Sequence, residues 1–164
     1  MKLFGVTGWK NNGKTTLVER LVTEITGRGL IVSTIKHAHH AFDVDHKGRD
    51  SYRHRAAGAQ EVLVGSGARW ALIHELRGAP EPTMDELLAR LSPCDLVLIE
   101  GYKRGPHPKV EAYRAEAGKE LIASDDDTIR LIATDTPLDL ERPQRDLDDI
   151  TGIADFILRD VGLA

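Results

Sequence analysis

Near its N-terminus the chain reads Gly8-Trp9-Lys10-Asn11-Asn12-Gly13-Lys14-Thr15. This run matches the pattern G-x-x-x-x-G-K-[ST], which is typical of a loop that binds the phosphates of a nucleotide. The mostly apolar residues 2–6 before it predict a buried strand. After it, apolar residues recur at helical spacing and predict a helix that ends near Gly27 and Gly29. Strand, loop and helix thus follow one another in the order that such a loop requires.

The chemistry of such a loop gives each part of it a role. Backbone N–H groups of the turn and of the first helical residues hold phosphate oxygens, helped by the positive end of the helix dipole. Gly8 and Gly13 permit dihedrals and a close approach that a side chain would obstruct. The Lys14 ammonium reaches the β- and γ-phosphates, and the Thr15 hydroxyl ligates Mg²⁺. We therefore predict a nucleotide-binding segment made of Gly8, Trp9, Lys10, Asn11, Asn12, Gly13, Lys14, Thr15 and Thr16.

The composition is that of an ordinary globular protein. With 164 residues, 41% of them hydrophobic, the chain is long enough for one domain and short for two, so we expect a single nucleotide-binding domain over residues 1–164. A net charge of -4 and a pI near 6.0 argue against nucleic acid as the main partner. The single Cys94 excludes an internal disulfide. No apolar run is long enough for a membrane span or a signal peptide, so we expect a cytoplasmic protein.

Further apolar runs predict the remaining strands of a sheet. Residues 30–35 and 96–99 read as strands without interruption, and residues 109–113 and 129–133 as two more. Such runs suit a sheet that is covered on both faces. The pattern predicts an α/β fold of the P-loop nucleoside-triphosphatase type, with a mostly parallel sheet flanked by helices.

Other elements are expected between and after these strands. Residues 61–64 and 69–76, joined by a glycine turn, predict an added β-hairpin, and Asp50 or Ser51 is expected to cap a short helix that ends near Ala59. A capping box at 83–86 predicts a helix start, and a closing helix is expected from residue 150, capped near Asp149. Residues 136–149 are polar and predict irregular structure.

Ligands of an open α/β sheet bind beyond the carboxyl ends of its strands, and this rule selects further candidates. Glu100 follows the most strand-like run and is predicted to serve Mg²⁺, directly or through water, together with Thr15. Asp95 flanks the same strand, but it lies five residues earlier, about 16 Å away at about 3.3 Å per residue. We therefore predict a structural role for Asp95.

The polar segment 36–55 holds candidates that the residues alone leave open. Asp43 and Asp45 are either catalytic, holding Mg²⁺ waters or an attacking water, or simple loop acids. The bases of this segment either neutralise the phosphate charge of a nucleotide or second ligand, or form a solvated helix face. They are Lys47, Arg49, Arg53 and Arg55.

Two further motifs bear on metal and base binding. His37, His39 and His40 lie close together and carry the imidazole that Zn²⁺, Cu²⁺ and Ni²⁺ accept, although a closed zinc site normally uses thiolates as well. The guanine motif N-K-x-D is absent, because the only asparagines are Asn11 and Asn12. We predict instead that Asp135, at a strand end, accepts hydrogen bonds from guanine.

Taken together, four stretches resemble the family of molybdopterin-guanine dinucleotide biosynthesis adapter proteins. They are the phosphate loop, residues 34–45, residues 50–59 and residues 95–103. The run from Lys36 to Ala59 is far more specific than the phosphate loop, and the resemblance continues more loosely to the end of the chain. The sequence departs from the family pattern at Trp9 and Lys10, where family members have small residues. Lys10 is also one place off the extra lysine used by the related metal-chaperone and signal-recognition GTPases, so we assign it no catalytic role across a dimer.

The resemblance implies a homodimeric GTP-binding protein with weak GTPase activity that assists molybdenum cofactor guanylyltransferase. It implies that residues 8–15 bind phosphates and that Thr15 and Glu100 serve Mg²⁺. It also implies that a His/Asp/Arg segment faces a second ligand, with molybdopterin or its guanine dinucleotide as a candidate, or a partner. The residues of that segment are His37, His39, His40, Arg49, Arg53 and Arg55.

Two alternatives from other classes stay open. In a small-molecule kinase, Asp43 or Glu100 would deprotonate an acceptor hydroxyl while the arginines steady phosphate. In a metal-insertion GTPase chaperone, the histidine cluster would carry the metal.

Overall fold

The computed structural model describes residues 1–38 and 42–164, and the chain forms two compact units. One unit contains Met1–His37 and Leu91–Ala164, and the other contains Ala38–Arg90. The single domain expected from the sequence stays a prediction, and each unit is described by itself. Among the described residues, no helix combines the length and the apolar character that crossing a membrane would require.

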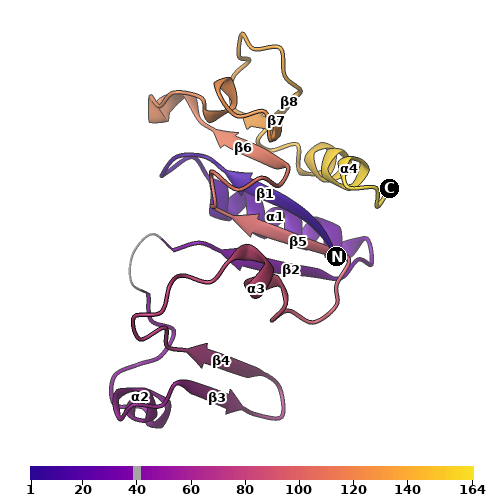
Figure 1. Cartoon of the computed structure of the whole chain (residues 1–164). Helices are drawn as coiled ribbons and strands as arrows, with labels where there is room; N and C mark the ends of the chain where they lie inside the picture. The colour runs from indigo at the N-terminus through magenta and orange to yellow at the C-terminus, as the bar shows by residue number, and fades with distance from the viewer. Residues whose placement is uncertain (39–41) are drawn as a thin grey trace. The chain divides into compact units, whose positions relative to one another are not determined.

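The first unit is built on a parallel sheet in the order β2-β5-β1-β6-β7-β8. Its strands run in the same direction, as Figure 1 shows. Their bounds are β1 Lys2–Thr7, β2 Val32–Lys36, β5 Leu96–Glu100, β6 Lys109–Tyr113, β7 Ile129–Thr134 and β8 Gln144–Asp146. The predicted strands and the mostly parallel sheet are confirmed.

Two helices pack together on one face of this sheet. They are α1 (Lys14–Gly27) and α4 (Ile150–Asp160). Fully buried Leu21 and Ile25 of α1 and Ile153 of α4 meet alternate residues of the strands, such as Phe4 of β1. The ends of both helices agree with the sequence, because Gly29 takes a left-handed φ of 87° after α1, and the Asp149 carboxylate accepts a hydrogen bond from Gly152 N at the start of α4.

A second, smaller apolar cluster covers part of the sheet's other face. Ile132 alternates with Leu131 and Ala133, so it points to the face opposite α1 and packs with Ala123. Ala123 belongs to the short 3₁₀ helix η2 (Ile122–Ser124), which follows η1 (Ala115–Ala117). The buried carboxylate of Glu111 on β6 anchors η2 by accepting hydrogen bonds from the backbone N–H groups of Ile122 and Ala123, at 3.0 and 2.8 Å.

One strand of the sheet was not predicted. Residues 136–149 were expected to be irregular, but Gln144–Asp146 form β8, which pairs in parallel with β7. The segment is short, polar and at the sheet edge, so it carries none of the apolar pattern that marks a strand in a sequence. Its pairing with β7 makes it a strand.

The second unit holds the hairpin and two short helices. Strands β3 (Glu61–Gly65) and β4 (Trp70–His74) pair antiparallel, as predicted. The helix α3 (Met84–Leu88) begins with the predicted capping box between Thr83 and Glu86. The helix α2 (Asp50–Ala56) corrects the prediction twice: its N-cap is Arg49, without a side-chain cap, and it ends at Ala56. Asp50 lies inside the first turn, and the Ser51 hydroxyl is bonded to Asp45 instead.

Candidate functional site at the phosphate loop

The phosphate loop, residues 8–15, joins β1 to α1 by a backbone path that needs its glycines. Gly8 has a φ of 137°, and a Cβ on it would lie 2.4 Å from the carbonyl oxygen of Ala112 on β6. Gly13 has a φ of 82° and forms the N-cap of α1, where no described side chain caps the helix. Glycine therefore permits both the close approach to β6 and the left-handed turn into the helix. The first amides of α1 stay available to a ligand.

Lys14 turns back onto the loop. Its Nζ donates a hydrogen bond to the carbonyl oxygen of Trp9 at 2.7 Å, and the side chain is half-buried. Burial lowers the pKa of Lys14, and the charges of Lys103 and Lys36 lower it further, while Glu100 opposes them.

Thr15 and Glu100 meet although they are 85 residues apart in sequence. The Thr15 hydroxyl donates to Glu100 Oε1 at 2.8 Å, and Lys36 Nζ lies 3.3 Å from the same oxygen. The Glu100 side chain is 12% exposed. Two adjacent oxygens on an octahedral Mg²⁺ stand about 2.9 Å apart, so this pair matches the spacing of two magnesium ligands. Asp95, at the other end of β5, accepts a hydrogen bond from Ile31 N, in line with its predicted structural role.

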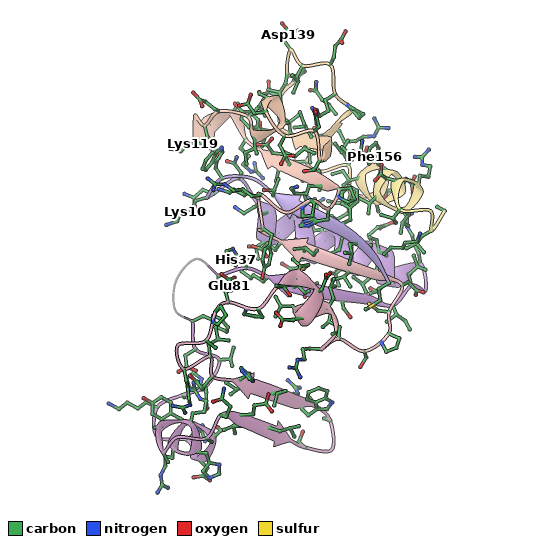
Figure 2. The ribbon with its side chains drawn as sticks, in the orientation of Figure 1. Lys10, His37, Glu81, Lys119, Asp139 and Phe156 are labelled. Carbon is green, nitrogen blue, oxygen red and sulfur yellow. The ribbon has the colours of Figure 1, made fainter. Side chains whose placement is uncertain are left out.

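The other residues of the loop differ in what they expose. Lys10 is exposed, and its side chain points away from the ribbon (Figure 2). Asn11 has a left-handed φ of 71°. Asn12 is fully buried, and its side-chain amide has no hydrogen-bond partner. The backbone N–H of Asn12 donates to the carbonyl oxygen of Trp9 at 3.3 Å, so no group of Asn12 is exposed to a ligand. Thr16 lies exposed in the first turn of α1.

Trp9 opens onto a hollow of about 620 Å³ beside the loop. Its indole Nε1 donates to the carbonyl oxygen of Glu120, and the Lys103 ammonium lies 3.8 Å from the centroid of its ring. Arg104, Asp125 and Asp126 also line the hollow. The sequence did not identify Lys103 as a candidate site residue, because its contact with Trp9 joins two residues that are far apart in the chain.

The segment 101–108, which carries Lys103, is held at both ends. At its start the ring of Tyr102 lies 4.5 Å from that of His37, between centroids. At its end the fully buried Lys109 donates from Nζ to the carbonyl oxygens of Gly105 and His107, at 2.6 and 3.2 Å, and to the Thr128 hydroxyl. His37 therefore packs against the segment that follows Glu100. His39 and His40 lie outside the described residues.

Asp135 follows β7 at the same edge of the sheet. Its Oδ1 accepts a hydrogen bond from Ala115 N at 3.0 Å, and its Oδ2 lies 3.9 Å from Nη1 of Arg114. As expected for ligand-binding residues of a parallel sheet, the phosphate loop, Glu100 and Asp135 all lie at the carboxyl ends of the strands.

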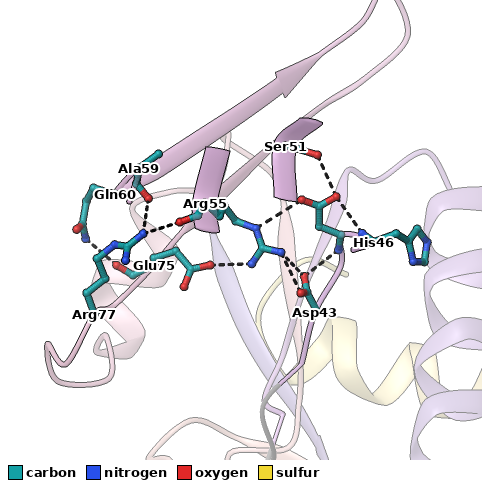
Figure 3. Close-up of polar contacts among 9 residues, drawn as sticks. Asp43, His46, Ser51, Arg55, Ala59, Gln60, Glu75 and Arg77 are labelled. Carbon is teal, nitrogen blue, oxygen red and sulfur yellow. Dashed lines mark hydrogen bonds and ion pairs between the residues drawn. The ribbon is translucent and has the colours of Figure 1, made fainter. Parts of the chain in front are cut away.

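In the second unit, a cluster of carboxylates surrounds Arg55 (Figure 3). Nη2 of Arg55 donates to both oxygens of Asp43 at 2.8 and 2.9 Å, and Nη1 donates to Glu75 at 2.7 Å. Nε lies 3.5 Å from Asp45 Oδ2. The hydrogen bond from Arg55 holds the pKa of Asp43 below its usual range, which makes this carboxylate a weaker base.

The predicted basic group does not converge on one point within its unit. Arg55 is 13% exposed and its charge is matched by the carboxylates. Arg53 is 74% exposed and lies 3.8 Å from Asp50, and Arg49 is exposed at the N-cap of α2. Among the described residues, no three His, Cys, Asp or Glu side chains come together as a metal site. The transition-metal prediction falls partly on His39 and His40, outside the described residues.

Comparison with known proteins assigns the chain to a family. Residues 3–135 match the family described as MobB, molybdopterin guanine dinucleotide synthesis protein B. The chain belongs to the MobB family.

Similar MobB proteins cover nearly the whole chain. The molybdopterin-guanine dinucleotide biosynthesis adapter protein of Haemophilus influenzae is 40% identical over 158 residues, which are 94% of this chain and 86% of that protein. The adapter protein of Escherichia coli is 38% identical over 95% of this chain and 91% of its own length. Among solved structures, Bacillus subtilis MobB has a TM-score of 0.76 at 25% identity, with 98% of each chain covered. A MobB homologue from Bacillus stearothermophilus has a TM-score of 0.74 at 29% identity, with all of both chains covered. The predicted family resemblance and the P-loop α/β fold are confirmed.

The buried His107 of this MobB-family chain predicts a pH dependence of stability. Burial, together with the charge of Lys109, lowers the pKa of His107 to about 4 from 6.5, while Asp126 opposes the shift. Between these values the unfolded chain binds a proton that the folded chain does not, so the free energy of unfolding falls as the pH drops from 6.5 towards 4. This histidine contributes a slope of at most about 1.4 kcal/mol per pH unit.

Urea unfolding from pH 8 to pH 4 measures this slope. Carboxylates titrate in the same range, so the contribution of His107 is the difference between wild type and His107→Gln, with both curves aligned at pH 8. We expect the variant to have the shallower curve. Parallel curves would show that His107 takes up its proton equally in both states.

Proposed function

We propose that this chain is a GTP- and Mg²⁺-binding adapter that assists molybdenum cofactor guanylyltransferase in making the guanine dinucleotide form of the cofactor. The observation that carries the proposal is the contact between Thr15 and Glu100 at the start of the phosphate loop's helix. It provides two oxygens spaced for one magnesium ion beside loop amides that can hold phosphates. Family membership supports the adapter role over the kinase and the metal chaperone.

The electrostatics of the site favour a polyphosphate bound with its metal. Burial, and then the nearby charges of Lys103 and Lys36, lower the pKa of Lys14, and Glu100 is the carboxylate that opposes this shift. An anion relieves the repulsion between the lysines, and a divalent cation replaces the lysines as the partner of Glu100. GTP with Mg²⁺ satisfies both conditions.

Slow hydrolysis follows from the same arrangement. Fast GTP hydrolysis needs a residue that positions the attacking water and an arginine that neutralises charge in the transition state. Glu100 is engaged by Thr15 and Lys36, and Arg55 is engaged by the carboxylates of its own unit. We therefore propose weak intrinsic turnover, with Asp43 and Asp45 kept as candidate catalytic residues and molybdopterin as the candidate second ligand.

Nucleotide titrations of two variants test the GTP and Mg²⁺ sites separately. Lys14→Ala removes a cation that contacts the phosphates, so we expect GTP binding to weaken about a hundredfold with or without Mg²⁺. Glu100→Gln removes a magnesium ligand, so binding weakens about tenfold in Mg²⁺. Without Mg²⁺, the Glu100→Gln variant should bind GTP as tightly as wild type or more tightly, because it lacks a negative charge near the phosphates.

Asp95→Asn is the matched control, because it makes the same carboxylate-to-amide change at the other end of β5. It should leave GTP binding unchanged in both conditions. The proposal fails if folded Lys14→Ala protein binds GTP as tightly as wild type, or if Glu100→Gln responds to Mg²⁺ as wild type does.

A pull-down with the guanylyltransferase tests the adapter role. The wild-type chain should retain the enzyme more strongly with GTP and Mg²⁺ than without them, because the bound nucleotide changes the charge of the surface at the phosphate loop. The Lys14→Ala chain should show no such difference. If the enzyme were captured equally with and without GTP, and equally by wild type and by Lys14→Ala, the result would contradict a nucleotide-dependent adapter.

A homodimer is the proposed assembly, and an apolar face of the hairpin supports it. The register pairs Leu63 with Leu72 and Gly65 with Trp70, so Leu63, Leu72 and Trp70 share one face. Their exposed fractions are 65%, 39% and 64%. A soluble protein rarely leaves such a face uncovered, and we propose that a second copy of this chain covers it.

Sedimentation equilibrium measures the expected dimer. Replacing Leu63 and Trp70 by glutamate places charges on the proposed interface, so the double variant should sediment as a monomer. A control variant with Val64→Glu, at an exposed position on the opposite face of the same hairpin, should remain a dimer. A wild-type monomer at all concentrations would exclude this assembly.

A further inference from the structure

Arg114 lies against the phosphate loop from the side opposite Glu100. It follows β6 directly, and a Cβ built on Gly13 would lie 3.4 Å from its Nε and 3.7 Å from its Nη2. The guanidinium thus packs on the last glycine of the loop, at a position where a larger residue would meet it. The side chain is 39% exposed, so one part of it touches the loop while another is open to a ligand.

The same segment connects the loop to the end of β7. Nη1 of Arg114 lies 3.9 Å from Asp135 Oδ2, and the N–H of Ala115 donates to Asp135 Oδ1 at 3.0 Å. Two consecutive residues therefore bind one carboxylate, which fixes its orientation relative to Gly13. Asp135 and Arg114 form a single arrangement at this edge of the sheet.

The strand order indicates how a bound nucleotide is oriented across the site. In the sheet, β5 lies on one side of β1, and β6 and then β7 lie on the other. The Thr15–Glu100 pair is on the β5 side, so that side suits the metal and the terminal phosphates. The nucleoside end of a bound nucleotide must then lie toward β6 and β7, whose axes stand about 5 and 10 Å from β1 at the usual strand spacing.

The chemistry of this edge suits a base better than a phosphate. The carboxylate of Asp135 beside Arg114 repels phosphate oxygens and partly neutralises the arginine. A guanidinium is flat and weakly hydrated, so it stacks readily on an aromatic ring, whereas a carboxylate accepts hydrogen bonds from ring N–H and exocyclic NH₂ groups. A flat cation next to an acceptor is an arrangement that fits a purine.

We propose that Arg114 binds the nucleoside end of the nucleotide, stacking its guanidinium on the purine base that Asp135 contacts at its edge. This inference rests on the proposed nucleotide site and adds to it a residue that recognises the base. Arg114 would then contribute to recognition of the base, which the N-K-x-D motif provides in many GTPases. No stretch of this sequence has the order N-K-x-D.

Calorimetric titration with GTP and with inorganic tripolyphosphate, both with Mg²⁺, separates base contacts from phosphate contacts. Arg114→Ala should weaken GTP binding about tenfold, the order expected for a guanidinium stacked on an aromatic ring, and leave tripolyphosphate binding unchanged. Lys14→Ala should weaken both ligands. Arg114→Lys keeps the charge but loses the plane, so it should remain weakened several-fold toward GTP.

Arg28→Ala is the matched control, since Arg28 is also a partly exposed, ion-paired arginine but lies at the other end of α1. It should bind both ligands as wild type does. Circular dichroism checks the fold of each variant, and Arg114→Gln replaces Arg114→Ala if the alanine variant does not fold.

Each other result counts against the inference. Equal loss of GTP and tripolyphosphate would mean that Arg114 shapes the loop or contacts phosphate, and unchanged GTP binding would mean that it contacts neither. A wild-type chain that binds neither ligand would refute the proposed function itself. A wild-type chain that binds both ligands, with Arg114→Ala equal to it, would refute only the role of Arg114.

Discussion

The parallel pairing of β1 with β5 on one side and with β6 on the other places the whole candidate site. The register sets Val6 beside Glu100 and Thr7 beside Glu111, so β1 and β5 end at nearly the same level while β6 runs two residues further, to Tyr113. From this level the chain leaves β1 into the phosphate loop, and Gly8 passes under the carbonyl of Ala112. A shift of the register would separate Thr15 from Glu100, and with them the two oxygens spaced for a metal ion.

Positive charge accumulates at this edge, and its distribution explains several contacts. Lys14 lies on the carbonyl of Trp9, Lys36 pairs with Glu100, and Lys103 lies over the indole of Trp9. Each ammonium thus has a partner of partial or full negative charge within the unit, and burial still lowers the pKa of Lys14. Such a site gains most from an anion that replaces several of these partners at once.

The Arg55 cluster illustrates how a run of charges in sequence can be misinterpreted. Arginines next to a phosphate motif suggest phosphate contacts, yet Arg55 binds Asp43, Asp45 and Glu75 within its own unit. The cluster ties the segment before α2 to the end of the hairpin, because Glu75 follows β4. Among the described residues of this unit, the acids and Arg55 stabilise one another, and Lys47, Arg49 and Arg53 of the predicted basic group are exposed to a partner.

The sequence by itself determined the strand-loop-helix unit, most of the strands, the hairpin, both helix caps that involve Thr83 and Asp149, and the position of Glu100, rather than Asp95, at the phosphate-loop end of its strand. These follow from local periodicity, from turn and cap chemistry and from the length of a strand, all of which act between residues close in the chain. Only the tertiary structure decided that β8 is a strand, that Lys14 bends onto its own loop, that Asn12 is buried, and that Arg114 lies on Gly13. The physical reason is that each of these depends on a neighbour brought close by strand pairing or on exclusion from water, and neither is encoded in the spacing of nearby residues.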